Sequence, residues 1–136
     1  MKKSKALVLS FAILFALVMA ASCRSPSPDC ECLKTGVFQS LTADSSFIYR
    51  NHSHELNINQ RGDSMHLEIE WPSNCNYVLH FVSSTDPKYQ NQQNPDLSIQ
   101  VDKIDFQDSL YYYTASINKL EIKGKVRMLE FNKVAR

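Results

Sequence analysis

The chain has 136 residues, of which 43% are hydrophobic and 21% are charged, and this composition excludes a wholly disordered chain. The formal net charge is +1, but three of the 15 basic residues lie within the first five positions. Without those three, 12 basic residues stand against 14 acidic ones. The rest of the chain is therefore slightly acidic, and its charge does not support binding to nucleic acid or to an anionic membrane. About 114 residues follow the first 22, which is enough for one domain.

The first 22 residues have the pattern of an export signal. Three lysines form a positive start, and residues 6–21 are an uncharged, apolar run. This run is shorter than the roughly 20 residues that a membrane-spanning helix needs. Ala20-Ala21-Ser22 precedes Cys23, which resembles a bacterial lipobox, where cleavage leaves a diacylglyceryl cysteine at the new N-terminus. We therefore expect a signal helix over residues 1–22 and lipidation of Cys23.

The residues around Cys23 also indicate where the protein is delivered. Residues 23–31 contain a Pro/Ser-rich segment and are expected to form an extended tether, with a β-domain over residues 32–136. Arg24 rather than Asp follows the cysteine, which resembles the enterobacterial signal for the outer membrane. Because no acidic cluster of the surface-export type comes next, we expect a lipid-anchored envelope protein. We expect it in the outer rather than the inner membrane, on the periplasmic face.

The other cysteines predict one disulfide bond, because exported proteins fold in an oxidising compartment. Cys75 is expected to pair with Cys32 or with Cys30, and we take Cys32 and Cys75 as the candidate pair. The bond closes a loop of about 43 residues, which stabilises the fold by about 4 kcal/mol in the chain-entropy model. The third cysteine then stays a thiol or pairs with another chain. Cys30-Glu31-Cys32 is also a metal-ligating pattern, but no second pair follows it at a fixed spacing.

From Val37 onward the hydrophobic period is two residues, which predicts β-strands. Residues 65–71 alternate strictly between apolar and polar side chains. The polar segment 86–96 is too long for a plain hairpin and is expected to cap one end of the sheet. We predict an all-β domain, a single small antiparallel meander that forms a barrel or a sandwich, with a lipocalin-like half-barrel as one form. The expected strands are residues 37–41, 46–50, 56–58, 65–71, 77–82, 97–101, 110–117, 120–123 and 126–133.

Two turns set the expected register of the central strands. A two-residue turn at Gly62-Asp63 pairs Ile58 with Leu67. The next loop pairs Ile69 with Leu79, and both turns then place the same apolar face inward. The predicted core is Leu56, Ile58, Leu67, Ile69, Trp71, Tyr77, Leu79 and Phe81.

The same register places titratable side chains on the outer face of the central hairpin. His66, Glu68 and Glu70 alternate with core residues, His80 lies opposite Glu68, and Glu55 is expected nearby. Imidazoles and carboxylates bind divalent cations and act as general acids and bases. The competing interpretation is a solvated face with a cross-strand Glu–His pair worth about 0.2–1 kcal/mol, and alternation favours it. Because no nucleophile stands with a base, we predict no catalytic residue and no cofactor.

Motifs spread over residues 30–134 carry a family resemblance. They are Lys34–Phe38, Ile48–Arg50, Glu68–Trp71, Cys75 and Tyr77–Leu79. They resemble a small family of exported bacterial proteins without a characterised function, some of which carry the label "DNA topoisomerase IV". A slightly acidic, exported chain of this size has no ATPase domain and no DNA gate, so we expect no such activity. The start Gly36-x-Phe38 is also similar to lipocalin-like lipoprotein domains, which bind hydrophobic ligands or envelope components.

These features predict a membrane-anchored lipoprotein whose β-domain binds a small hydrophobic ligand or an envelope protein and is not an enzyme. The membrane is reached through the lipid anchor, and no nucleic-acid partner is expected. The alternative is a metal-binding or metal-dependent hydrolytic site on His66, Glu68, Glu70 and His80. A purely structural role in the envelope is a third interpretation.

Overall fold

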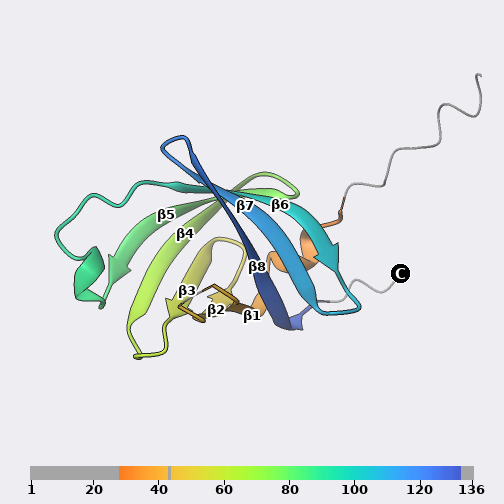
Figure 1. The fold of residues 1–136 in the computed structure, drawn as a ribbon, viewed down its shortest axis with the longest axis horizontal. Helices are drawn as coiled ribbons and strands as arrows, with labels where there is room; N and C mark the ends of the chain where they lie inside the picture. The colour runs from red at the N-terminus through yellow and green to blue at the C-terminus, as the bar shows by residue number, and fades with distance from the viewer. Residues whose placement is uncertain (1–27, 43, 133–136) are drawn as a thin grey trace, which may run out of the picture.

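The computed structural model describes residues 28–42 and 44–132, and these form a closed antiparallel β-barrel (Figure 1). Each strand pairs with its neighbour in the sequence, and the last strand pairs back with the first. The predicted export signal, Cys23 and most of the tether lie outside the described residues. In the described part of the chain, no helix has the length and the apolar character needed to cross a membrane.

The barrel has the predicted all-β meander topology, with two short 3₁₀ helices added. In chain order the elements are η1 (Glu31–Leu33), β1 (Gly36–Ser40), β2 (Phe47–Arg50), β3 (His54–Ile58), β4 (Ser64–Ser73), β5 (Asn76–Ser84), η2 (Pro87–Tyr89), β6 (Leu97–Asp105), β7 (Leu110–Ile117) and β8 (Leu120–Phe131).

The last two predicted strands are one continuous strand, β8. Gly124 does not interrupt it, because it stays paired with Tyr113 of β7. The Tyr113 ring occupies the space that a Cβ at position 124 would need. A glycine is therefore required here so that an aromatic ring can lie against the neighbouring backbone.

The hydrophobic core fills the barrel with inward-facing side chains from every strand except β3. From the predicted core, Leu67, Ile69, Tyr77 and Leu79 are buried, and Trp71 and Phe81 pack against them partly buried. The buried hydrophobic residues are Cys30, Cys32, Leu33, Phe38, Ile48, Leu67, Ile69, Tyr77, Leu79, Ile99, Val101, Tyr111, Ala115, Val126 and Met128. An eight-stranded barrel has an interior just wide enough for such side chains to fill.

The predicted register is correct between β4 and β5 but wrong between β3 and β4. Ile69 pairs with Leu79 as expected, whereas Ile58 pairs with Ser64 rather than with Leu67. The connection is a five-residue loop rather than a two-residue turn, because the Asn59 side chain accepts hydrogen bonds from the backbone N–H groups of Arg61 and Asp63.

This shift turns β3 over, because neighbouring residues of a strand face opposite sides of the sheet. Leu56 and Ile58, predicted to lie in the core, are only partly buried and do not belong to it. Glu55, predicted on the outer face, is 3% exposed and points into the barrel. The inward side of β3 is thus polar.

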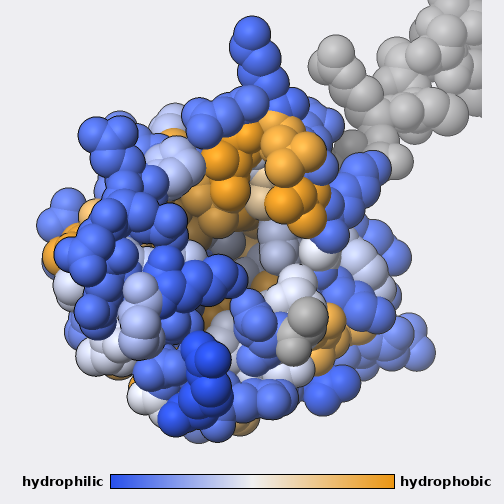
Figure 2. Space-filling model, turned by 60° about the vertical axis from the view of Figure 1, so that its left-hand side comes forward, coloured by the Kyte–Doolittle hydropathy of each residue, from blue (hydrophilic) through white to orange (hydrophobic). Residues whose placement is uncertain are grey.

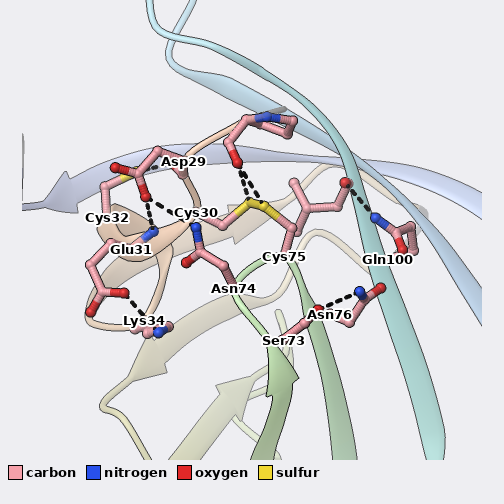
Figure 3. The surroundings of a disulfide bond; sticks show 12 residues. Asp29, Cys30, Glu31, Cys32, Lys34, Ser73, Asn74, Cys75, Asn76 and Gln100 are labelled. Atoms are coloured by element: carbon pink, nitrogen blue, oxygen red, sulfur yellow. Dashed lines mark hydrogen bonds and ion pairs between the residues drawn. A yellow bond between two sulfur atoms is a disulfide. The ribbon is translucent and has the colours of Figure 1, made fainter. Parts of the chain in front are cut away.

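One end of the barrel is closed by η1, which a disulfide bond fastens to the turn between β4 and β5 (Figure 3). The bond joins Cys30 to Cys75, so the candidate pair Cys32–Cys75 is wrong and the other alternative is correct. Residues two apart in a 3₁₀ helix face different directions, and this separates Cys32 from Cys75. Cys32 is a buried free thiol whose Sγ lies 3.8 Å from the Asp29 carbonyl oxygen. Burial, together with nearby Asp29, raises the pKa of this thiol, so it stays protonated.

A buried ion pair lies directly beneath η1. Arg50 of β2 and Glu55 of β3 are opposite each other, and the Arg50 Nε and Nη2 atoms are each 2.8 Å from Glu55 Oε2. Arg50 Nη1 donates to the Leu33 carbonyl oxygen of η1 at 3.0 Å. Arg50 Nη2 donates to the hydroxyl oxygens of Tyr77 and Tyr111. Arg50 therefore joins the helix that closes the barrel to strands on both sides of the interior.

Electrostatics keep the Arg50 guanidinium charged and the Tyr77 hydroxyl protonated. Burial alone would lower the pKa of the Arg50 guanidinium, but Tyr111, Tyr77 and Glu55 outweigh it and raise that pKa well above its ordinary value. Burial raises the pKa of Tyr77, against the opposing effect of Arg50. The guanidinium also lies 4.9 Å from the Phe38 ring centroid and 4.8 Å from that of Tyr77, which favours a cation between the two rings.

Candidate functional site

The end of the barrel opposite η1 is open and forms a pocket of about 420 Å³. Figure 2 looks towards this end and shows a hollow with a mostly hydrophilic rim and hydrophobic residues gathered on its upper side. We call this cavity the mouth pocket. It is lined by Asp44, Ser46, Asn57, Asn59, Gln60, Arg61, Asp63, Ser64, Met65, Ser84, Asp86, Lys88 and Tyr89. Its volume is within the range of small-molecule sites, which is about 300–1,000 Å³.

The wall of the mouth pocket is built by an ion-pair network between two connections. Arg61, in the loop between β3 and β4, places Nη2 2.8 Å from Asp86 Oδ2 and Nε 3.1 Å from Asp63 Oδ2. Asp86 caps η2 by accepting a hydrogen bond from the Lys88 backbone N–H at 3.0 Å. Ser84 supports Asp86 by accepting its backbone N–H. The polar loop that was expected to cap one end of the sheet therefore begins by forming this wall.

The floor of the pocket holds a polar atom without a partner. Asn57 lies two residues beyond Glu55 on the inward side of β3, and it is paired with Met65 of β4. Its Oδ1 atom is buried and has no hydrogen-bond partner, and it is the one such side-chain atom found among the described residues. An unpaired buried carbonyl oxygen costs about 1–3 kcal/mol relative to a hydrogen-bonded one. This oxygen is shielded from solvent, so the open space of the pocket does not reach it.

A second cavity, of about 680 Å³, lies on the outside of the barrel over β1 to β5. Tyr49, Leu56 and Val82 provide its apolar surface, and His66 and Glu68 of the predicted metal site also line it. Outward side chains line most of this outer groove, and the inward-facing Arg50, Glu55 and Leu67 also border it. It shares no lining residue with the mouth pocket and is separate from it.

The structure does not bring the four predicted metal ligands together. His80 lies opposite Glu68 as expected, but its ring nitrogens contact Glu70 at 3.5 Å and Asp96 at 2.9 Å. His66 lies opposite Ser83 instead. Among residues 28–42 and 44–132, no group of three or more His, Cys, Asp or Glu side chains is arranged to hold a metal ion. The outer face of the hairpin thus carries a surface ion-pair cluster around His80.

The sequence interpretation missed the polar interior of β3. In residues 55–59, polar and apolar side chains alternate, so the pattern does not show which set faces the barrel interior. The prediction places the apolar Leu56 and Ile58 in the core. One signal could have corrected the orientation. Arg50 and Glu55 have opposite charges and flank a short turn, which places them opposite each other in a hairpin.

Comparison of this chain with models of known protein families, with curated proteins and with solved structures found no match.

Proposed function

We propose that this protein is a lipid-anchored, non-catalytic binding domain of the bacterial envelope that takes a small polar ligand into its mouth pocket. The observation that carries the proposal is the mouth pocket itself, a cavity of about 420 Å³ whose lining side chains are mostly charged, amide or hydroxyl groups. The anchor and the envelope location rest on the lipobox at Cys23.

A polar ligand fits the mouth pocket better than the hydrophobic ligand that the lipocalin-like resemblance implies. Most of the lining side chains are charged, amide or hydroxyl groups, with Met65 as the aliphatic exception. The interior between the pocket and η1 is occupied by core side chains and by the Arg50 cluster. Ligand sites in barrels of this size are shaped by what the side chains leave open, and here they leave a polar mouth.

The test is a native mass spectrum of the full chain purified from the envelope, compared with that of two variants. Ser46→Trp places an indole in the mouth pocket, whereas Ser98→Trp places one on the exposed outer face of β6. We expect a retained small molecule, or an adduct from a metabolite extract, on the parent and on Ser98→Trp. Ser46→Trp should lack it.

Two results contradict the proposal. One is a parent protein that carries and gains no added mass from any extract. The other is an adduct that survives Ser46→Trp, which would place the ligand elsewhere, with the outer groove as the next region to block.

A further inference from the structure

Strand β8 is longer than the part of it that closes the barrel against β1. It has 12 residues, and β1 pairs with it only from Val126 to Phe131. Beyond Val126 the Leu41 N–H still donates to the Lys125 carbonyl oxygen at 3.1 Å. Residues 120–124 are paired with β7 on one side, and in the described part of the chain no strand pairs with their other side. We call this stretch, in the dark blue hairpin of Figure 1, the free edge of β8.

The free edge presents unpaired backbone groups. In an antiparallel strand, the N–H and C=O groups of one residue point to the same side, and those of the next residue point to the opposite side. Lys125 directs its carbonyl oxygen towards β1. Lys123 and Glu121 therefore direct their N–H and C=O groups to that side as well. These two donors and two acceptors have the spacing at which an extended chain offers its own.

The side of the free edge that faces the barrel interior is apolar and open. Ile122 is paired with Ala115, and Leu120 with Ile117 of β7. Ala115 is 6% exposed, whereas Ile122 is 49% and Leu120 is 61% exposed. Ala115 has strands on both sides, because β6 pairs with β7, but no described strand lies beyond Ile122. A chain placed beside β8 would remove this apolar surface from water, which favours binding.

The outward side of the free edge has an excess of positive charge. Lys123 and Lys125 are exposed on β8, and Lys119 lies in the turn before it, with Glu121 as the one carboxylate between them. Among the described residues, these three lysines form no ion pair. Side chains directly opposite on neighbouring antiparallel strands lie about 4.5–5.5 Å apart. A carboxylate on the outward face of an added strand would therefore meet Lys123 directly.

Charge and tethering both favour a different chain over a second copy as the occupant of this edge. A second copy would bring the same excess of lysines. Two copies related by a two-fold axis at their free edges also run antiparallel, so their Phe131 ends, beside η1, would point in opposite directions. If Cys23 is acylated as the sequence predicts, tethers in one membrane hold both of these ends at the same surface.

We propose that the free edge of β8 binds an extended peptide segment of another protein as an added β-strand. Apolar side chains at alternate positions of the segment cover Leu120 and Ile122, and acidic side chains between them face Lys123. Its backbone pairs with the open N–H and C=O groups of Glu121 and Lys123. The free edge shares no residue with the lining of the mouth pocket, so this inference goes beyond the proposed function and does not depend on it.

The experiment measures binding of fluorescent peptides to the full chain by fluorescence polarisation. The probe is a seven-residue peptide of alternating valine and glutamate, which we expect to bind. A valine–lysine peptide should bind about three- to tenfold more weakly, because like charges then lie opposite each other. An N-methylated valine–glutamate peptide, which lacks backbone donors, should bind about tenfold or more weakly than the probe.

Variants of β8 test the site on the protein. Lys123→Pro removes an N–H group that points away from β7, so the pairing of β7 with β8 is kept. It should weaken binding of the probe about tenfold or more at an almost unchanged melting temperature. Lys123→Ala keeps the donor and should reduce only the preference for the glutamate peptide.

Two further substitutions test the apolar contact and provide the control. Ile122→Ser should weaken binding of the probe about fivefold, and it remains informative if proline at position 123 unfolds the hairpin. Leu129→Ser is the matched control, because it changes an exposed leucine of the same strand where β1 covers the edge. It should leave binding unchanged.

Three binding results overturn the inference. They are no binding of the probe, binding that neither Lys123→Pro nor Ile122→Ser weakens, and equal binding of the glutamate and lysine peptides. A dimer of the parent in sedimentation that Lys123→Pro dissociates also overturns it, because a second copy then occupies the free edge. The proposed function is tested separately, by Ser46→Trp in the mouth pocket.

Discussion

At the scale of single residues, the buried pair Arg50–Glu55 is the strongest polar feature of the barrel. Its side chains are 1% and 2% exposed, so little solvent screens the interaction. Its geometry is favourable, because the Arg50 guanidinium makes three hydrogen bonds and two contacts with aromatic rings in addition to its bonds with Glu55. A buried ion pair as a whole adds little to the free energy of unfolding, because both charges lose their hydration. Removing one partner is costly, because the other charge stays buried without a counterion.

Glu55→Gln should therefore destabilise the protein by about 3–5 kcal/mol, because Arg50 remains charged without its counterion. Urea unfolding followed by circular dichroism measures the change. The control is Asp105→Asn, which weakens the exposed 3.7 Å pair with Lys103 and should cost less than about 1 kcal/mol. Equal costs for the two variants would contradict the central role that we give to the buried pair.

His80 gives a residue-scale prediction with a defined pH dependence. Its pKa is raised, first by a hydrogen bond to Asp96 and also by Glu70. A raised pKa in the folded state means that the interaction stabilises fully below the unfolded pKa of about 6.5 and is lost as pH rises through the folded value. We expect the His80 imidazole to titrate above its ordinary pKa by NMR, and Asp96→Asn to lower that pKa.

The difference in melting temperature between the parent and Asp96→Asn should follow the same pattern. It should be largest below about pH 6.5, where His80 is protonated, and disappear as pH rises through the raised pKa of His80. Asp102→Asn, within β6 and accepting a hydrogen bond from the Thr114 hydroxyl, is the control and should show no such window. A difference that grows with pH would have the wrong sign for this account.

At the scale of elements, η1 depends on its covalent link to the barrel because three residues cannot form a stable helix alone. The Cys30–Cys75 bond spans a sequence separation of 45. Cys30→Ala with Cys75→Ala should cost about 4 kcal/mol in urea unfolding, from the entropy regained by the unfolded chain.

Cys32→Ala tests whether the free thiol, rather than the disulfide bond, contributes to the stability of the fold. It leaves the disulfide in place and removes one small buried side chain, so its cost should be clearly smaller. Reducing agent should destabilise the parent and Cys32→Ala alike, and should not affect the double variant. If reducing agent destabilised the double variant as much as the parent, a different bond would be responsible.

The elements also show how far sequence reasoning reaches in this fold. Strand types, the meander and the pairing of β4 with β5 follow from alternation, because strictly alternating residues such as 65–71 fit one orientation only. The orientation of β3 depends on side-chain bonds from Asn59 within a five-residue loop, and a pattern of apolar residues does not contain that information. The mouth pocket was missed for the same reason, since Asn57 reaches it only when β3 is turned over.

At the scale of the whole molecule, the two ends of the barrel differ in how firmly they are held. The η1 end has the disulfide, the buried ion pair and the tilted rings of Trp71 and Tyr77, whose centroids are 4.7 Å apart. The mouth end consists of connections whose wall is held by the exposed side chain of Arg61. Local stability follows the density of buried contacts, so the two ends should open with different free energies.

Native-state hydrogen exchange measures that difference. Amides in the paired parts of β6, β7 and β8 should exchange slowest, and those of the loops between β3 and β4 and between β5 and β6 fastest. A small polar ligand that occupies the mouth pocket, as we propose, should slow exchange in the loops and leave the η1 end unchanged. Uniform protection at both ends would mean that the mouth is as rigid as the strands.

The closed end also determines which way a tethered barrel points. Because Cys75 holds Cys30, the described chain starts at Pro28 beside η1, away from the connections that surround the mouth (Figure 1). Four residues lie between Cys23 and Pro28 in the sequence, and the five Cα–Cα steps of a fully extended chain reach at most about 18 Å. If Cys23 is acylated as the sequence predicts, the end closed by η1 stays beside the bilayer and the mouth faces the aqueous compartment. On the periplasmic face that the sequence predicts, a mouth oriented in this way would meet dissolved molecules rather than molecules carried by the membrane.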